Sequence, residues 1–136
     1  MILLDTNVLL WRTGEDRRLG KQARRTIDRA VDRNAACVSV ISLWEIATLI
    51  RKQRIRLGQP LRDWSRIAFA SPGLRLMPVD ERIAIDAGEL EGIPGDPADR
   101  TIIATARALA CPLLTADSEI LAYAEQGHVQ AIDATR

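Results

Sequence analysis

The chain has 136 residues, 47% of them hydrophobic, which is enough for one sizeable core and predicts a single domain over residues 1–136. The net charge of +1 gives no reason to expect a polyanion or a membrane surface as partner, and 4% aromatic residues argue against base recognition by aromatic stacking. No apolar run reaches the roughly 18 residues of a membrane span and no basic leader precedes one, so we expect a cytoplasmic protein without membrane contact.

Short apolar runs alternate along the chain with longer segments of helical period. The predicted strands are residues 2–4, 37–41, 74–79, 112–115 and 129–132. The predicted helices are residues 17–33, 43–53, 61–70, a segment after Asp80, 98–110 and 118–126. This alternation is typical of βαβ units, so the sequence predicts an α/β fold around a parallel sheet.

The cysteines and the histidine offer little chemistry. Cys37 and Cys111 lack the paired spacing of a zinc site and lie in apolar surroundings, so we expect buried, reduced thiols. The single histidine, His128, follows Gly127 and is expected at the surface or in a turn.

Acidic residues stand at the ends of the predicted elements, and each has a purely structural explanation. Ser42 to Glu45 fits a capping box, in which the glutamate reaches back to the start of its own helix. The other acids could cap or open helices or turns in the same way; they are Asp5, Asp96, Asp99 and Asp117.

Taken together, these acids indicate a shared site. Asp5 ends the first predicted strand, Glu45 lies one turn into the helix after the second, and Asp117 follows the fourth. Asp99 opens the helix that leads into the fourth strand, so the loop before it must bring it to the others. Groups at the carboxyl ends of parallel strands share one crevice at the topological switch point.

Such a cluster needs a source of positive charge. Two carboxylates 4 Å apart repel each other by roughly 4 kcal/mol at an effective dielectric constant of 20. Helix N-termini relieve part of this repulsion, and a divalent cation relieves more. A set of hard oxygen ligands with few imidazoles favours Mg²⁺ or Mn²⁺ over zinc.

Four segments carry a resemblance to a known family. Leu3-Leu-Asp-Thr-Asn-Val-Leu9, Ser42-Leu-Trp-Glu-Ile-Ala47, Asp96-Pro-Ala-Asp-Arg-Thr-Ile-Ile-Ala-Thr-Ala106 and Leu114-Thr-Ala-Asp117 resemble, in order and over nearly the whole chain, the motifs of PIN-domain ribonucleases, specifically VapC-type toxins of bacterial toxin–antitoxin pairs. The resemblance implies a three-layer α/β/α fold with a central, mostly parallel sheet of four or five strands. It also implies a metal-dependent endoribonuclease.

The resemblance further implies roles for single residues. The catalytic quartet would be Asp5, Glu45, Asp99 and Asp117, of which Asp5, Asp99 and Asp117 would hold the metal. Hydrogen bonds that steady the quartet are expected from Thr6, Asn7 and Thr115. Two further acids, Asp96 and Glu119, are left outside the quartet because cap roles explain them nearly as well. Many members carry a histidine, a basic residue and an aromatic around the Asp-Pro pair; the difference here, at Pro94, Gly95 and Ala98, concerns the pocket's shape and the preferred RNA.

Partners follow from the same resemblance and from local charge. RNA would be held at the rim of the acidic site by Arg51 and Lys52, with Arg100 facing the cleft, although solvated helix faces explain such cations about as well. VapC-like proteins are expected to form homodimers and to be inhibited by a small cognate antitoxin. The helical segment 61–69, with Trp64 and Phe69, could serve such a contact, but core packing is the favoured interpretation.

Other classes fit the sequence less well. A haloacid-dehalogenase-type phosphotransferase requires a second aspartate where this chain has Asn7, and both that class and receiver domains require a late lysine. The only lysines are Lys21 and Lys52. The remaining alternative is a non-catalytic PIN-like module that binds RNA or protein, which would have no need to bear the repulsion among four carboxylates.

Overall fold

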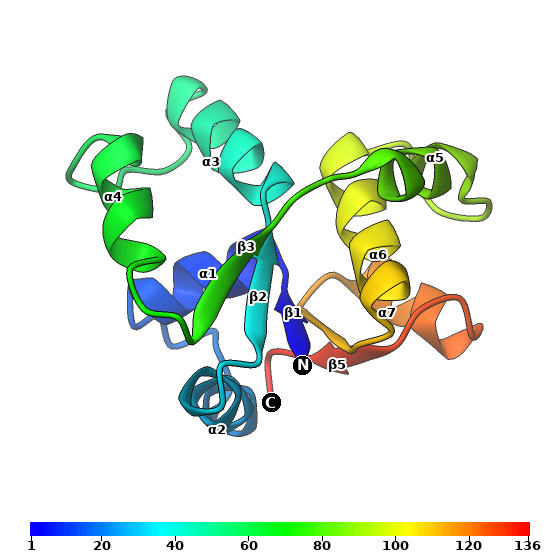
Figure 1. The fold of residues 1–136 in the computed structure, drawn as a ribbon, viewed down its shortest axis with the longest axis horizontal. Helices are drawn as coiled ribbons and strands as arrows, with labels where there is room; N and C mark the ends of the chain where they lie inside the picture. Colours follow the sequence, from blue (N-terminus) through cyan, green and yellow to red (C-terminus); the bar gives the residue numbers. More distant parts are fainter.

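A computed structural model describes residues 1–136 and contains one five-stranded sheet with seven helices (Figure 1). The strands are β1 (Ile2–Leu4), β2 (Ala36–Ser39), β3 (Leu74–Met77), β4 (Leu113–Thr115) and β5 (Ala131–Asp133). The helices are α1 (Thr6–Thr13), α2 (Lys21–Asp32), α3 (Ile41–Arg51), α4 (Leu61–Ala68), α5 (Glu81–Glu89), α6 (Pro97–Leu109) and α7 (Ser118–Glu125).

The sheet is parallel throughout, in the order β3-β2-β1-β4-β5. From β1 the chain moves outward first to β2 and β3 and later, on the other side, to β4 and β5. The topological switch point therefore lies between β1 and β4, and the crevice of this fold is expected at the carboxyl ends of these two strands.

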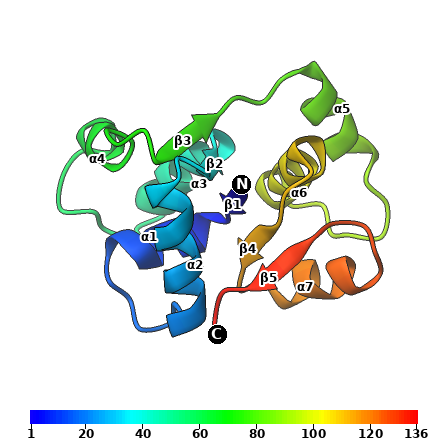
Figure 2. The ribbon, with the colours of Figure 1, turned by 60° about the horizontal axis from the view of Figure 1, so that its bottom comes forward.

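Helices cover both faces of the sheet, which gives two separate cores (Figure 2). Ile2 and Leu4 of β1 face one core, which also receives apolar side chains from α1 to α4. Leu3 faces the other, which is built mainly with α6 and α7. The two-residue period of a strand sends neighbouring side chains to opposite faces, so β1 serves both cores. The prediction of a three-layer α/β/α fold is confirmed.

The largest local error of the sequence analysis concerns α1. No helix was predicted between Asp5 and residue 17, yet the segment after Asp5 forms a helix of 8 residues with Asp5 as its N-cap. Its apolar run has no polar residue between Val8 and Trp11, which hides the helical period. Val8 and Leu9 are nevertheless fully buried, while Asn7 is exposed. Burial of that one face, and not an obvious amphipathic pattern, stabilises the helix.

Smaller differences lie at the element ends. The second predicted strand ran to Ile41, but the chain turns at Val40 and α3 begins at Ile41.

Side-chain burial agrees with several expectations. Trp64 of α4 is 8% exposed and belongs to the core, which was the favoured interpretation. Both cysteines are free and buried, and His128 is exposed in the turn after α7. None of the helices combines the length and the apolar character needed to cross a bilayer.

Candidate metal centre

Asp5 is the buried centre of the site, with 6% of its surface exposed. It ends β1 and caps α1, and its Oδ1 accepts a hydrogen bond of 2.8 Å from the backbone N–H of Thr6. Its Oδ2 accepts one of 2.6 Å from the hydroxyl of Thr115. Burial raises the pKa of Asp5, these two hydrogen bonds oppose the rise, and the charges of Asp117 and Asp96 add to it. A buried carboxylate of this kind is stabilised as an anion only by nearby positive charge.

Thr115 ties the ends of the two strands at the switch point together. While its hydroxyl donates to Asp5, the same oxygen accepts from the backbone N–H of Asp117 at 3.0 Å. Asp117 in turn caps α7, accepting from the N–H groups of Glu119 at 2.8 Å and Ile120 at 3.4 Å. The carboxylates of Asp5 and Asp117 are thus fixed relative to each other by a short polar chain.

A second group of acids comes from α3 and α6. Glu45, Asp96 and Asp99 each offer a carboxylate oxygen, and these oxygens all lie within 4.8 Å of one another. Asp96 caps α6 by accepting from the N–H groups of Ala98 and Asp99, at 2.9 and 3.1 Å. In Figure 1 the first turns of α3 and α6 lie on either side of the sheet at its upper end, where the strands finish. The long loop before Asp96 therefore does bring Asp99 to the crevice.

The structural explanation offered for Glu45 does not hold. Helix α3 begins two residues earlier than a capping box at Ser42 would require, and its N-cap, Val40, makes no side-chain hydrogen bond. The Ser42 hydroxyl instead lies 2.8 Å from the Thr6 hydroxyl. Since Glu45 has no role in capping its helix, its carboxylate remains available to the acidic cluster.

The two groups of acids act electrostatically as one cluster of five. Burial raises the pKa of Asp99 to about 7, with further contributions from Asp96, Asp5, Asp117 and Glu45 in that order. Burial likewise raises the pKa of Glu45, with contributions from Asp5 and Asp96 and an opposing hydrogen bond from Thr6. Raised pKa values of this kind mark carboxylates that lack compensating charge.

No side-chain cation neutralises this cluster. The ion pairs of the structure join other residues, and none includes one of the five acids. The N-termini of α1, α6 and α7 supply partial positive charge, because Asp5, Asp96 and Asp117 cap these helices. Oxygen-only ligands without histidine or cysteine fit a hard dication such as Mg²⁺ or Mn²⁺, so the residues present are suited to hold one.

Asp96 is the member of the cluster that the sequence analysis kept outside the site. It does cap its helix, but a cap three residues before Asp99 stands at the same helix end and therefore at the same crevice. The capping role was read as an alternative to a functional role, although one carboxylate has two oxygens and can serve both. Glu119, the other acid held back, is exposed and does not contribute to the raised pKa values.

Two of the predicted site residues make no hydrogen bond to the acids. Asn7 is exposed and its side chain makes no hydrogen bond, so it does not steady Asp5 as Thr115 does. Arg100 was expected to face the cleft and bind RNA, and this was wrong. Its guanidinium donates to the carbonyls of Ala87, Gly88, Leu90, Ile93 and Pro94 at 2.6–3.5 Å, which leaves no N–H group for a phosphate. Arg51 and Lys52 are exposed at the end of α3.

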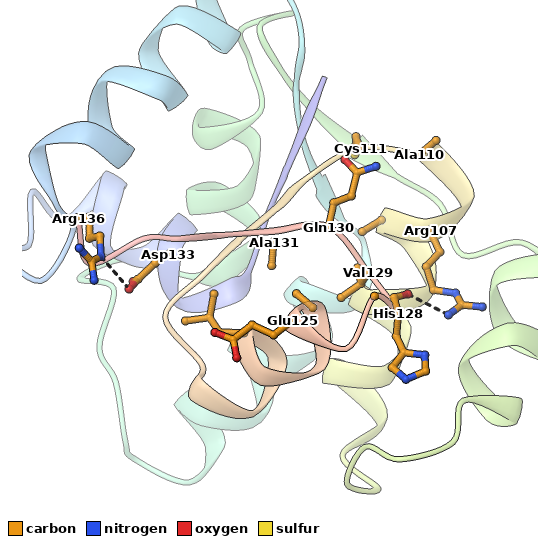
Figure 3. Close-up of a pocket in the computed structure, with 14 residues that line it drawn as sticks. Arg107, Ala110, Cys111, Glu125, His128, Val129, Gln130, Ala131, Asp133 and Arg136 are labelled. Atoms are coloured by element: carbon orange, nitrogen blue, oxygen red, sulfur yellow. Dashed lines mark hydrogen bonds and ion pairs between the residues drawn. The ribbon is translucent and has the colours of Figure 1, made fainter.

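A large hollow of about 880 Å³ lies elsewhere, between α6, α7 and β5 (Figure 3). None of the five acids lines it. Arg107 donates there to the backbone carbonyl of His128 at 3.0 Å and pairs with Asp86 at 3.0 Å, and Arg136 pairs with Asp133 at 3.6 Å. Its arginines are thus already paired within the protein.

The parallel sheet and the acids at its switch point define an α/β protein with an acidic candidate metal site. The PIN domain family matches residues 2–126, so the chain belongs to that family. Within the family, the chain is 32% identical over 123 residues to Ribonuclease VapC22 of Mycobacterium tuberculosis, covering 90% of this chain and 91% of that protein.

Solved structures share the fold at lower identity. A chain of VapBC2 from Rickettsia felis, crystallised with a DNA fragment from its promoter, has a TM-score of 0.68 at 16% identity, over 97% of this chain and 98% of that chain. A chain of FitAcB from Neisseria gonorrhoeae has a TM-score of 0.64 at 22% identity, over 98% of both chains.

Proposed function

We propose that the protein is a metal-dependent endoribonuclease and the toxin of a toxin–antitoxin pair. The observation that carries this proposal is the cluster of five carboxylates at the switch point without a cationic side-chain partner. A module that only binds would gain nothing from holding these charges together against their repulsion. The similarity to Ribonuclease VapC22 supports RNA as the substrate.

The residues divide the chemical work as follows. Asp5, Asp99 and Asp117 would hold Mg²⁺ or Mn²⁺, and Asp96 would add an oxygen beside Asp99. A dication held by these residues would lower the pKa of a bound water and would stabilise charge that develops on the phosphate. Glu45, whose own pKa is raised, orients the attacking water and accepts its proton. Thr115 keeps the carboxylate of Asp5 in place through their hydrogen bond.

RNA reaches this acidic centre through cations at its rim. Arg51 and Lys52 end the helix that carries Glu45, are exposed, and form no ion pair, so they are suited to contact phosphates. Such contacts position the substrate and carry little sequence information.

The proposed protein partners rest on the relatives. Similar folds occur in toxin–antitoxin complexes, such as one from Klebsiella pneumoniae with a TM-score of 0.57. We propose that a small antitoxin occupies the acidic groove and that the toxin forms a homodimer. Co-expression with the product of a small neighbouring reading frame tests the first statement, and the mass measured by light scattering tests the second.

The central experiment is a cleavage assay on a structured RNA with purified protein. Wild-type protein is expected to cut in Mg²⁺ or Mn²⁺ and to stop when the metal is chelated. Asp99→Asn is expected to abolish cutting because it removes a ligand charge at the centre of the cluster. Glu81→Gln is the matched control, since Glu81 also lies in the first turn of a helix but outside the cluster. If Asp99→Asn cut at the wild-type rate, the proposed mechanism would be wrong.

The alternative function is an RNA- or protein-binding module without catalysis. Calorimetric titration with Mg²⁺ and Mn²⁺ separates the nuclease from the module. The nuclease should bind metal and lose this binding in the Asp99→Asn variant, whereas a module without a metal centre should bind no metal at this site. Tight RNA binding without cleavage, at saturating metal, would favour the module.

A further inference from the structure

A groove of about 450 Å³ runs along the exposed face of α1, away from the acidic cluster. Asn7, Leu10, Trp11 and Gly14 form its first wall, and these positions follow the three- and four-residue steps of one helix face. The residues 54–57, in the connection between α3 and α4, form the wall opposite. We call this feature the α1 groove.

The α1 groove begins in the first turn of α1, the helix that Asp5 caps. Asn7 lies two residues after Asp5, in the same first turn of α1, and its exposed side chain makes no hydrogen bond within the protein. Helix α1 has 8 residues and so extends about 12 Å from that point. An RNA strand held at the acidic centre can therefore continue along α1 into the groove.

Positive charge is concentrated in the groove. Three arginines against one aspartate leave it a net charge of +2 among its lining residues. Arg54 and Arg56 are both exposed and neither forms an ion pair or a side-chain hydrogen bond. They lie in the chain just after Arg51 and Lys52, so unpaired cations continue from the rim of the acidic centre into the groove.

The third arginine, Arg18, is held flat and rigid. Its guanidinium makes side-chain hydrogen bonds of 2.7–3.2 Å to the carboxylate of Asp16. Its Cζ lies 4.9 Å from the centre of the Trp11 ring, so the indole supports it from one side. The Arg18 side chain is still 68% exposed. A planar guanidinium that is already fixed, with a free outer face, is a surface on which a nucleobase can stack at little entropic cost.

We propose that the α1 groove binds single-stranded RNA beside the cleavage site: Arg54 and Arg56 hold phosphates, and a base stacks on Arg18 where Trp11 supports it. The inference rests on the proposed function and adds to it the path of the substrate and its single-stranded form. The negative charge of phosphates complements the unpaired arginines. A duplex would have no unpaired base free to stack on the guanidinium of Arg18.

Binding is tested in an Asp99→Asn background, in which RNA is not consumed. The probe is a fluorescent, mixed-sequence single-stranded RNA of twelve nucleotides, and its anisotropy is followed over a salt series. Arg54→Ala with Arg56→Ala is expected to weaken binding at least tenfold and to lower the salt slope by about 1.4, because each phosphate contact on a single strand contributes about 0.7. Arg25→Ala with Arg29→Ala is the control, since it removes the same charge from the exposed face of α2.

Base stacking is tested at Arg18. Arg18→Ala is expected to weaken binding at least fivefold, and Arg18→Lys is expected to recover little of it, because lysine restores the charge without the planar surface. Arg17→Ala is the matched control, since Arg17 is exposed, adjacent in the chain and outside the groove. In the otherwise wild-type protein, the groove variants should raise KM with a much smaller change in kcat.

The outcomes separate this inference from the proposed function. If wild-type protein cuts RNA but the Arg54 and Arg56 variants bind it like the control, the groove is not the path and the nuclease proposal stands. Release of a co-purifying protein by these variants, with RNA affinity unchanged, would make the groove a protein interface and overturn the inference. Failure of wild-type protein to cut any RNA counts against the proposed function, whereas absence of RNA binding in the Asp99→Asn protein counts against both.

Discussion

The acidic centre and the hollow beside β5 differ in whether their charged side chains have partners of opposite charge. The hollow has a volume of about 880 Å³, but its arginines are paired with Asp86, Asp133 and a backbone carbonyl (Figure 3). At the acidic centre five carboxylates meet without a cationic side chain. Such repulsion is relieved when a ligand of opposite charge completes the site, so we propose the unpaired carboxylates as the place of the chemistry.

The largest expected effect separates the two regions by activity. Asp5→Asn should lower RNA cleavage at least a thousandfold, because it removes a buried charge at the centre of the metal site. Glu125→Gln, in the hollow, should leave the rate within a factor of about two. Both rates are measured in single-turnover assays, with the fold checked by circular dichroism. Equal rates for the two variants would show that the acidic centre is no more important for RNA cleavage than the hollow.

The next effect concerns the acid that the sequence analysis left aside. Asp96→Asn keeps an oxygen that can cap α6 but removes one charge from the cluster, so metal affinity should fall roughly 10- to 100-fold with little loss of helix stability. Isothermal titration with Mn²⁺ measures the affinity, and Asp133→Asn in the hollow is the control. An unchanged dissociation constant would return Asp96 to a purely capping role.

A third prediction uses the stability of the metal-free protein. The pKa of Asp99 is raised from 3.8 to about 7 in the fold, so the folded state binds this proton more tightly than the unfolded chain. Its stabilising contribution is complete below about pH 4 and is lost as the pH rises through 7. At pH 8, Asp99→Asn should therefore be more stable than wild type by about 1–2 kcal/mol, after allowance for solvent screening.

Chemical denaturation in EDTA at several pH values measures this difference, which should shrink toward pH 4. Saturating Mg²⁺ should reverse it, because the dication favours the ionised carboxylate. A wild-type protein that remained the more stable at pH 8 without metal would show that the acids are compensated from within the chain.

The smallest effect compares unpaired with paired cations. Arg51→Ala with Lys52→Ala should weaken RNA binding several-fold and flatten its salt dependence. Arg107→Ala with Arg136→Ala removes the same charge from the hollow, where both arginines are paired, and should change RNA affinity less. Anisotropy over a salt series measures both. Equal losses would mean that only the net charge of the protein matters.

The sequence sufficed for the features that depend on order along the chain. The alternation of apolar runs with helical segments was enough to predict a parallel α/β fold. The positions of Asp5 and Asp117 just after predicted strands then placed them at one crevice, because the carboxyl ends of neighbouring parallel strands coincide. The sequence failed at α1, where burial of Val8 and Leu9 overrides a pattern without helical period.

The role of Arg100 could not be predicted for a different reason. Its partners are backbone carbonyls, which every residue type carries, so no pattern of side chains announces them. A sequence shows that a cation stands beside Asp99, but only the path of the preceding loop decides whether it faces solvent or turns inward. Sequence pattern also failed at Ser42, because the helix starts two residues earlier than its expected capping role requires.

The arginine beside Asp99 also makes the acidic centre sensitive to a distant helix. Arg100 fastens the end of α5 and the irregular segment after it to the first turn of α6 through five carbonyls. The Tyr123 hydroxyl also holds this segment, by donating to the carbonyl of Glu91 at 2.7 Å. Arg100 therefore links α5 and the segment directly to the helix end that carries Asp96 and Asp99. We therefore expect that a partner that displaces α5 would shift Asp96 and Asp99 and change the rate of the proposed RNA cleavage without contacting any acid.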